Sequence, residues 1–155
     1  MRDFIITSLQ TWDIEIGSTI KNTALEISKQ NRVLYINTPM DISIRLRGDR
    51  QSPSYIRRIN ANMWVLDCPF MLFSANFLPA PLFNIVNRKN NARIARWIVE
   101  QAAALDFKNY IHLIDTDIYR SRYLKEYIHP SVSIYYRRDY VIGEAYWRRH
   151  GTRLE

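Results

Sequence analysis

The sequence predicts an α/β protein whose open, mostly parallel sheet carries helices on both faces. Three observations predict this class. Short apolar, β-branched runs alternate with longer segments of helical periodicity. The first strand, helix and strand fit within about 35 residues, the length of one βαβ unit. With 155 residues, 47% hydrophobic and 24% charged, the chain has the size and composition of one soluble, globular domain.

The chain opens with a strand, a helix and a second strand. The apolar residues of 3–9 are continuous and β-branched, which is typical of a strand covered on both faces. Ser18 can cap a helix whose apolar side chains recur every three or four residues. Residues 32–37 are a second strand, closed by Pro39. We expect the two strands to be parallel and their crossover right-handed.

The middle of the chain has a different period. Residues 38–53 contain two prolines, a glycine and several arginines, and we expect an irregular, mobile loop there. Residues 55–59 and 63–66 flank Asn60-Ala61-Asn62, which predicts a hairpin because asparagine tolerates the left-handed turn conformation. The aromatic and proline-rich residues 68–81 either shape the wall of a cleft or plug the edge of the core.

Two helix and strand pairs complete the predicted sheet. A proline-started helix covers about residues 82–105, and residues 109–114 form the next strand. A helix through residues 119–127 and a strand over residues 131–136 follow.

Composition limits the sites that the chain can build. It has four glycines and one cysteine, so a disulfide framework and a cysteine-based zinc site are excluded. A reducing compartment such as the cytoplasm is the natural setting, and we expect Cys68 to be a buried small hydrophobe. No signal peptide is visible, and no run approaches the ~18 apolar residues needed to span a bilayer.

The formal net charge of +7 raises the question of an anionic partner. An anionic membrane surface, a phosphorylated ligand or plain solvated faces would each fit the two arginine clusters. Nucleic acid is disfavoured because no recognition helix, aromatic RNP-like strand or zinc module occurs. The clusters are Arg45, Arg47, Arg50, Arg57 and Arg58, and then Arg137, Arg138, Arg148, Arg149 and Arg153.

Ligands of such sheets bind beyond the carboxyl ends of the strands. The residues predicted to lie there are 8–22, 115–120 and 137–139, which are far apart in the sequence. A dinucleotide site needs Gly-x-Gly-x-x-Gly and a phosphate loop needs Gly-Lys-Ser/Thr, but the first stretch offers Gly17 alone. We therefore exclude NAD binding and P-loop hydrolysis. The N–H groups of residues 18–20 could still hold one anion or hydroxyl.

Trp12 and Asp13 are the main candidate contacts in the first turn. An indole face suits the C–H face of a pyranose, and a carboxylate accepts hydroxyl hydrogens, so the pair could hold a sugar. Asp13 is also a candidate general base. The structural alternative is that Trp12 packs against the loop and Asp13 caps a turn.

The acids after the strand at 109–114 are a weaker signal. Asp115 and Asp117 resemble a carboxylate pair that could hold a metal, but without a third ligand we assign no metal site. Asp117 is better placed to cap the following helix. We interpret His112 as a packed core residue.

The ordered motifs resemble those of one enzyme family. They comprise residues 5–13, 21–29, 31–39 and 134–139, with Trp147 and His150-Gly151. Together they look like the N-terminal half of a bacterial glycosyltransferase of the two-Rossmann-domain (GT-B) type. The likeness is to the group 1 sugar transferases of capsular, lipopolysaccharide and teichuronic-acid synthesis.

The resemblance implies an enzyme that moves a sugar from a nucleotide-sugar to a cell-surface or lipid-linked glycan, with the protein peripheral on the inner face of the membrane. Residues 1–155 would be one Rossmann-like, acceptor-side domain, truncated before a C-terminal domain that holds the nucleotide-sugar. This domain would bind no cofactor itself, and alone it should be inactive. Its candidate substrate-binding residues are Trp12, Asp13, Gly17, Asp115, Asp117, Arg137, Arg138 and Asp139.

Two departures from the family pattern limit what is carried over. Residues 10–16 replace a glycine-rich turn, and residues 115–117 stand where some relatives have a histidine. The competing hypothesis is a non-catalytic α/β domain, either receiver-like or a protein-interaction module. A receiver needs an acidic cluster at the end of its first strand, whereas Asp3 begins that strand.

Overall fold

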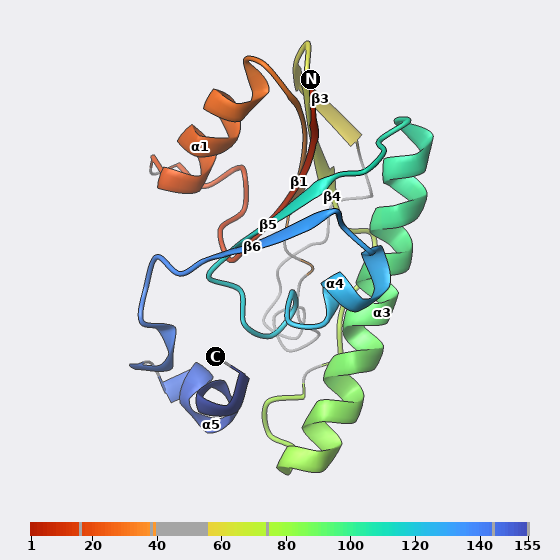
Figure 1. Cartoon of the computed structure of the whole chain (residues 1–155). Coiled ribbons are helices and arrows are strands. Elements are labelled where there is room, and N and C mark those ends of the chain that lie inside the picture. The colour runs from red at the N-terminus through yellow and green to blue at the C-terminus, as the bar shows by residue number, and fades with distance from the viewer. Residues whose placement is uncertain (16, 38, 40–55, 74, 144, 155) are drawn as a thin grey trace.

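Six strands form one sheet in the computed structural model, which describes residues 1–15, 17–37, 39, 56–73, 75–143 and 145–154 (Figure 1). The strands are β1 (Asp3–Ser8), β2 (Arg32–Asn37), β3 (Ile56–Asn60), β4 (Met63–Asp67), β5 (Ile111–Asp115) and β6 (Val132–Tyr136). The helices are α1 (Thr19–Ser28), α3 (Ala80–Ala104), α4 (Leu124–Ile128) and α5 (Ala145–Leu154), with a 3-10 turn, η1, at Val141–Gly143.

The sheet has the order β3-β4-β2-β1-β5-β6, and every neighbouring pair is parallel except the β3–β4 hairpin. Helix α1 covers one face, and α3 and α4 cover the other (Figure 1). The predicted class, an open and mostly parallel sheet with helices on both faces, is confirmed. The hairpin and the long helix also lie within two residues of their predicted positions.

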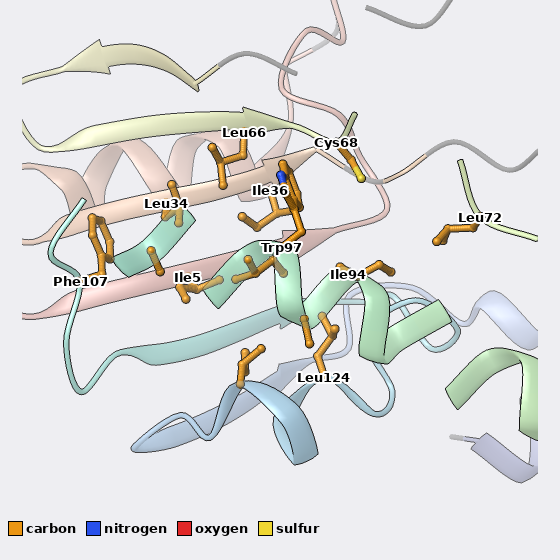
Figure 2. Packing of buried hydrophobic residues seen from close by; sticks show 14 residues of the cluster. Ile5, Leu34, Ile36, Leu66, Cys68, Leu72, Ile94, Trp97, Phe107 and Leu124 are labelled. Carbon is orange, nitrogen blue, oxygen red and sulfur yellow. The ribbon is translucent and has the colours of Figure 1, made fainter. Parts of the chain in front are cut away.

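The two faces of the sheet carry separate cores. On the α1 face, Ile6, Tyr35 and Val65 pack against Ile20 and Ala24, and Ser18 caps the helix by accepting from the Lys21 N–H. On the α3 face, alternate strand residues meet the long helix, as Figure 2 shows. That second core includes Ile5, Leu34, Ile36, Leu66, Ile94, Trp97, Ile98 and Leu124. Cys68 and His112 are buried, as expected.

The predicted helix at 119–127 is wrong in its first half, because only Leu124–Ile128 is helical. Tyr119 is instead used in long-range packing: its ring lies 5.2 Å from the Phe83 ring, and its hydroxyl donates to the Trp147 carbonyl at 2.9 Å. Residues 116–123 therefore form a series of turns beyond β5.

Helix α5 was not predicted. It packs through Trp147 on Val141 of η1 and on Ile118 and Tyr119, which follow β5. Gly151 lies closest to Ile142 and Ile118. A Cβ at residue 151 would lie 2.5 Å from Ile142 Cγ2 and 3.1 Å from Ile118 Cδ1. A side chain at this position would overpack the contact with Ile142 and Ile118. Glycine therefore fits here, although it destabilises a helix by about 1 kcal/mol relative to alanine.

The two edges of the sheet differ in character. Edge strand β3 carries Arg57 and Arg58 and an irregular register near Asn60, which discourage pairing with another strand. Edge strand β6 has no charged residue, and all five of its residues are exposed.

Some predictions lie outside the described residues: the irregular, mobile loop, apart from Pro39, and the cluster members Arg45, Arg47 and Arg50. Among the described helices, none combines the length and apolar character that crossing a bilayer requires.

Candidate functional site

The carboxyl ends of the parallel strands are the first place to look for a ligand. The chain leaves β1 toward β2 through α1 on one face, and it reaches β5 through α3 on the other face. The connections therefore diverge between β1 and β5, and in open α/β sheets ligands bind at this divergence. Ser8 and Asp115 end these two strands side by side.

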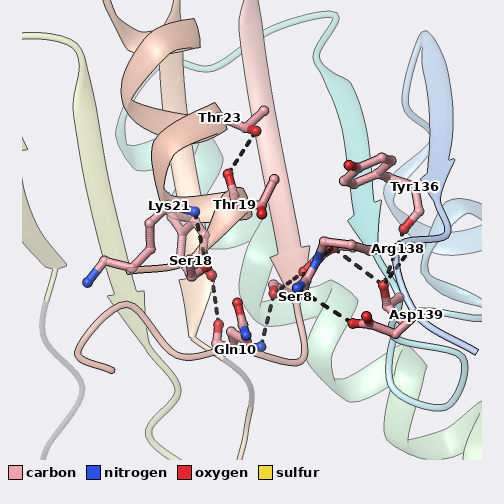
Figure 3. Close-up of polar contacts among 12 residues, drawn as sticks. Ser8, Gln10, Ser18, Thr19, Lys21, Thr23, Tyr136, Arg138 and Asp139 are labelled. Atoms are coloured by element: carbon pink, nitrogen blue, oxygen red, sulfur yellow. Dashed lines mark hydrogen bonds and ion pairs between the residues drawn. The ribbon is translucent and has the colours of Figure 1, made fainter. Parts of the chain in front are cut away.

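A buried polar cluster occupies that position (Figure 3). The fully buried Asp115 accepts a hydrogen bond from Ser8 Oγ at 2.7 Å. Arg138, just beyond β6, donates to both Asp115 oxygens, from Nε at 3.0 Å and from Nη2 at 3.1 Å. The Asp115 carboxylate raises the pKa of Arg138, mainly through these hydrogen bonds. Asp115 and Arg138, both predicted as site residues, are thus brought together as a neutral pair.

Thr116 connects β5 to the segment after β6 by hydrogen bonds that depend on its left-handed backbone conformation. Its φ is 59°, in the left-handed region, which is an outlier for a β-branched residue. The turn lets Thr116 Oγ1 accept from the Arg138 N–H at 3.2 Å, while the Thr116 N–H donates to the Tyr136 carbonyl at 3.1 Å. Strain of this kind collects at functional sites, which supports the importance of this strand end.

The prediction that Asp117 caps the following helix is wrong, because Asp117 caps the turn that precedes α4. Its Oδ1 accepts from the N–H groups of Tyr119 at 3.2 Å and Arg120 at 2.9 Å, and its Oδ2 lies 3.3 Å from Arg120 Nε. The cap closes a turn and not α4, which begins only at Leu124. Across the described residues, no three His, Cys, Asp or Glu side chains gather where they could hold a metal ion.

A second cluster lies beside the first turn, at the ends of β2 and β4. Arg57 donates to both oxygens of Asp13 at 2.8 and 2.7 Å, and its Nε donates to Asp67 Oδ2 at 2.9 Å. Asn37 links the two acids by donating to Asp67 Oδ1 at 2.5 Å and to Asp13 Oδ2 at 3.4 Å. The hydrogen bonds from Arg57 are the main cause that lowers the pKa of Asp13, and they raise the pKa of Arg57.

Trp12 is tied to the same cluster. Its backbone N–H donates to Asn37 Oδ1 at 2.6 Å, and its half-buried indole makes an edge contact with the Tyr35 ring at 5.4 Å. The Lys21 ammonium lies 5.2 Å from the indole centroid. Tyr35 donates to the Gln10 carbonyl at 2.7 Å, and burial raises the pKa of Tyr35 to about 12. The side-chain oxygen of Gln10 is buried without a donor.

The remaining predicted site residues lie at the surface. Asp139 is exposed, 3.5 Å from Arg138 Nη1, and the Arg137 guanidinium lies over the Tyr140 ring. Gly17 is exposed with open space around its Cα. The structure thus forms one group from Asp115, Arg138 and Asp139, and another from Trp12 and Asp13.

Four members of the two clusters were not among the predicted site residues: Ser8, Asn37, Arg57 and Asp67. Ser8, Asn37 and Asp67 are each the last residue of a parallel strand, and a polar residue there is a signal that the sequence contains. Arg57 had no such signal, because it pairs with Asp13 across 44 residues.

Comparisons with protein-family models, with curated proteins and with solved structures found no match for this chain.

Proposed function

We propose that this chain is the acceptor-binding N-terminal domain of a glycosyltransferase, which moves a sugar from a nucleotide-sugar to a cell-surface glycan or a lipid-linked acceptor. The observation that carries the proposal is the cluster of Asp13, Arg57, Asp67 and Asn37 beside the Trp12 indole at the carboxyl edge of the sheet.

This arrangement suits a sugar for two reasons. The side chain of Asp13 is 57% exposed, so a ligand can reach it, while Arg57 fixes its orientation with two hydrogen bonds. A pre-oriented carboxylate and guanidinium bind vicinal hydroxyls without losing further side-chain freedom. An adjoining indole adds apolar surface for the C–H face of the ring.

The catalytic role of Asp13 stays a prediction. A general base works best when its pKa lies near the operating pH, whereas Arg57 lowers the pKa of Asp13. Hydrogen-bond acceptance from a sugar hydroxyl is the role that this pairing favours. Because the first turn has no glycine-rich motif, we assign the nucleotide-sugar to a second domain, without which transfer is not expected.

Sugar binding is tested by saturation-transfer NMR of the domain with methyl pyranosides. Trp12→Ala is expected to weaken binding about 10-fold, because the ring loses its apolar platform. Tyr127→Ala, an exposed aromatic on α4, is the matched control and should leave binding unchanged. Equal binding by the Trp12→Ala variant and the unchanged chain would remove Trp12 from the site.

An anionic bilayer surface is the second partner that we propose, and the outer face of α3 supports it. Exposed apolar side chains lie just before this helix and in its first turns, and cations follow at helical spacing. No ion pair joins these cations to a carboxylate among the described residues. Lys89 and Arg96 can therefore meet lipid headgroups, whereas Arg93 lies over the Phe70 ring at 4.1 Å and donates to the Met71 carbonyl at 3.3 Å. The residues concerned are Phe77, Leu82 and Ile85, followed by Lys89, Arg93 and Arg96.

Vesicle co-sedimentation tests this surface. The double variant Leu82→Ser/Ile85→Ser is expected to bind vesicles of phosphatidylcholine and phosphatidylglycerol about 10-fold more weakly, since two apolar contacts are lost. Binding should also fall at high salt. Ile134→Ser, which changes an exposed residue of β6, is the control. If both variants bind as tightly as the unchanged chain, α3 is not the membrane-facing element.

A further inference from the structure

The outer edge of β6 is open to pairing with a further strand. Strand β6 pairs with β5 on one side, and among the described strands none pairs with it on the other side (Figure 1). It has neither the charged side chains nor the irregular register that protect β3 at the opposite edge. An unprotected edge presents a row of backbone N–H and C=O groups to an incoming strand. The two faces of β6 determine which strand fits.

The face of β6 on the α1 side is apolar. Ile134 lies on this face, because it is in register with Leu113, which belongs to the core under α1. Val132 lies on the same face, since side chains alternate along a strand. The two side chains are 43% and 47% exposed, so α1 does not cover them. An added strand would bury part of this surface if its residues on this face were apolar.

The other face of β6 borders a cavity of about 170 Å³. Ser133 and Tyr135 line it from β6, and Ser121, Arg122 and Lys125 line it from α4 and the turn before α4. A cavity of roughly 150 Å³ holds a benzene ring, and the side chain of a glutamate is slightly smaller than benzene. Because the edge strand itself forms part of the lining, an added strand would place every second side chain beside this cavity.

The exposed charge around this cavity is positive. Arg122 and Lys125 are exposed, and neither forms an ion pair with a carboxylate among the described residues. Asp117 also lines the cavity, but it is only 2% exposed and its Oδ2 lies 3.3 Å from Arg120 Nε. An incoming carboxylate therefore meets two available cations, and the acid in the lining is already compensated. This charge favours an acidic partner.

A second copy of the chain fits this edge less well. Two β6 strands that pair around a twofold axis form one continuous sheet, with α4 of both copies on the same face. Arg122 and Lys125 of one copy would then lie across the new strand pair from the same cations of the other copy. Like charges placed in this way repel, and the net charge of +7 on each chain adds to the repulsion.

We propose that β6 binds an extended, acidic segment of a partner protein as an additional strand of the sheet. Acidic and apolar residues alternate along the segment. A carboxylate enters the cavity beside Lys125, with the Ser133 hydroxyl as a further donor, while apolar side chains cover Val132 on the other face. Main-chain hydrogen bonds supply affinity, and the cavity supplies specificity. This surface shares no residue with the cluster beside Trp12 and does not rest on the proposed function.

A peptide titration tests strand addition. The probe is a capped peptide of about seven residues that alternates valine and glutamate, long enough to span β6. One control has lysine in place of glutamate. The other keeps the glutamates but is N-methylated at two adjacent inner residues, which removes a main-chain donor from each edge of the peptide. NMR titration of the isotope-labelled chain should show that the probe binds at least about 10-fold more tightly than either control.

Hydrogen exchange of the β6 amides is the second measurement. The N–H groups of β6 that do not donate to β5 point away from the sheet, so solvent reaches them in the free chain. In the complex with the probe they should exchange about 10-fold more slowly, because each then donates to a peptide carbonyl.

Lys125→Glu tests the cavity. It reverses one charge of the lining and is expected to raise the Kd of the glutamate peptide about 5-fold and to lower that of the lysine peptide. Lys29→Glu, at the end of α1, changes the net charge by the same amount and is the matched control. Both lysines are exposed, so neither substitution should unfold the chain.

Each other outcome overturns part or all of the proposal. Equal affinity for the N-methylated peptide, or unchanged exchange of the β6 amides in the complex, excludes strand addition. An equal loss of affinity in Lys125→Glu and Lys29→Glu shows that net charge alone attracts the peptide, and it removes the cavity from the site. A chain that is already a dimer without peptide, with protected β6 amides, has a second copy at this edge and not an acidic partner.

Discussion

Arg138→Met is expected to lower the free energy of unfolding by about 3 to 5 kcal/mol, because it leaves the buried Asp115 carboxylate without its charge partner. Asp115 is fully buried, and Arg138 supplies two of its hydrogen bonds. Ser8 Oγ is a neutral donor and cannot replace the lost positive charge. Urea unfolding at pH 7 measures the effect.

Arg122→Met is the matched control for this substitution. Arg122 is exposed, and no ion pair involves it among the described residues, so its replacement should change stability by no more than about 0.5 kcal/mol. The double variant Asp115→Leu/Arg138→Met should recover much of the loss, since it removes both charges from the interior. A cost for Arg138→Met no larger than that of the control would contradict the assignment of Asp115 and Arg138 as a tightly coupled pair.

Acidification is expected to destabilise the chain through His112. Burial lowers the pKa of His112 from its usual 6.5 to about 3. Between these two values the unfolded state binds one proton more than the folded state, so stability is complete above pH 6.5 and falls as the pH falls toward 3. At roughly 1.4 kcal/mol per pH unit, lowering the pH from 7 to 5 should remove about 2 kcal/mol through this one group.

His112→Gln should abolish this part of the pH dependence, whatever it does to stability at pH 7. The measurement is the difference in unfolding free energy between pH 7 and pH 5, by urea titration, for both chains. His129→Gln changes an exposed histidine at the end of α4 and should keep the pH dependence of the unchanged chain. Retention of the full pH dependence by His112→Gln would show that another group is responsible.

The sheet could be predicted from the sequence because its determinants are local. Continuous apolar runs mark β1, β2 and β5, and the serine cap and apolar stripe mark α1. Helix α5 could not be predicted, because its interior glycine disfavours a helix on local grounds. The reason for the glycine is its close approach to Ile118 and Ile142, which only the folded chain shows. The short α4 has the same origin, since Tyr119 is held by Trp147, 28 residues away.

The positions of the candidate residues could be predicted from the sequence, but the pairs that they form could not. The rule on strand ends placed Asp13, Asp115 and Arg138 at the carboxyl edge of the sheet, where the structure has them, because parallel strands bring their carboxyl ends together. Which cation neutralises which acid depends on contacts between distant segments: Arg57 and Asp13 lie 44 residues apart, and Arg138 and Asp115 lie 23 apart. Such pairs leave no periodic signal in the sequence.

Because β1 lies between β2 and β5, its two edges pair at different times during synthesis of the chain. One edge of β1 can pair with β2 soon after both are synthesised. The other edge pairs with β5, and the bond from Ser8 to Asp115 can form only after 107 further residues have been made. At roughly 5 to 20 residues per second, that edge stays open for about 5 to 20 seconds on the ribosome. A half-finished sheet with an apolar edge is the species that ribosome-associated chaperones would encounter first.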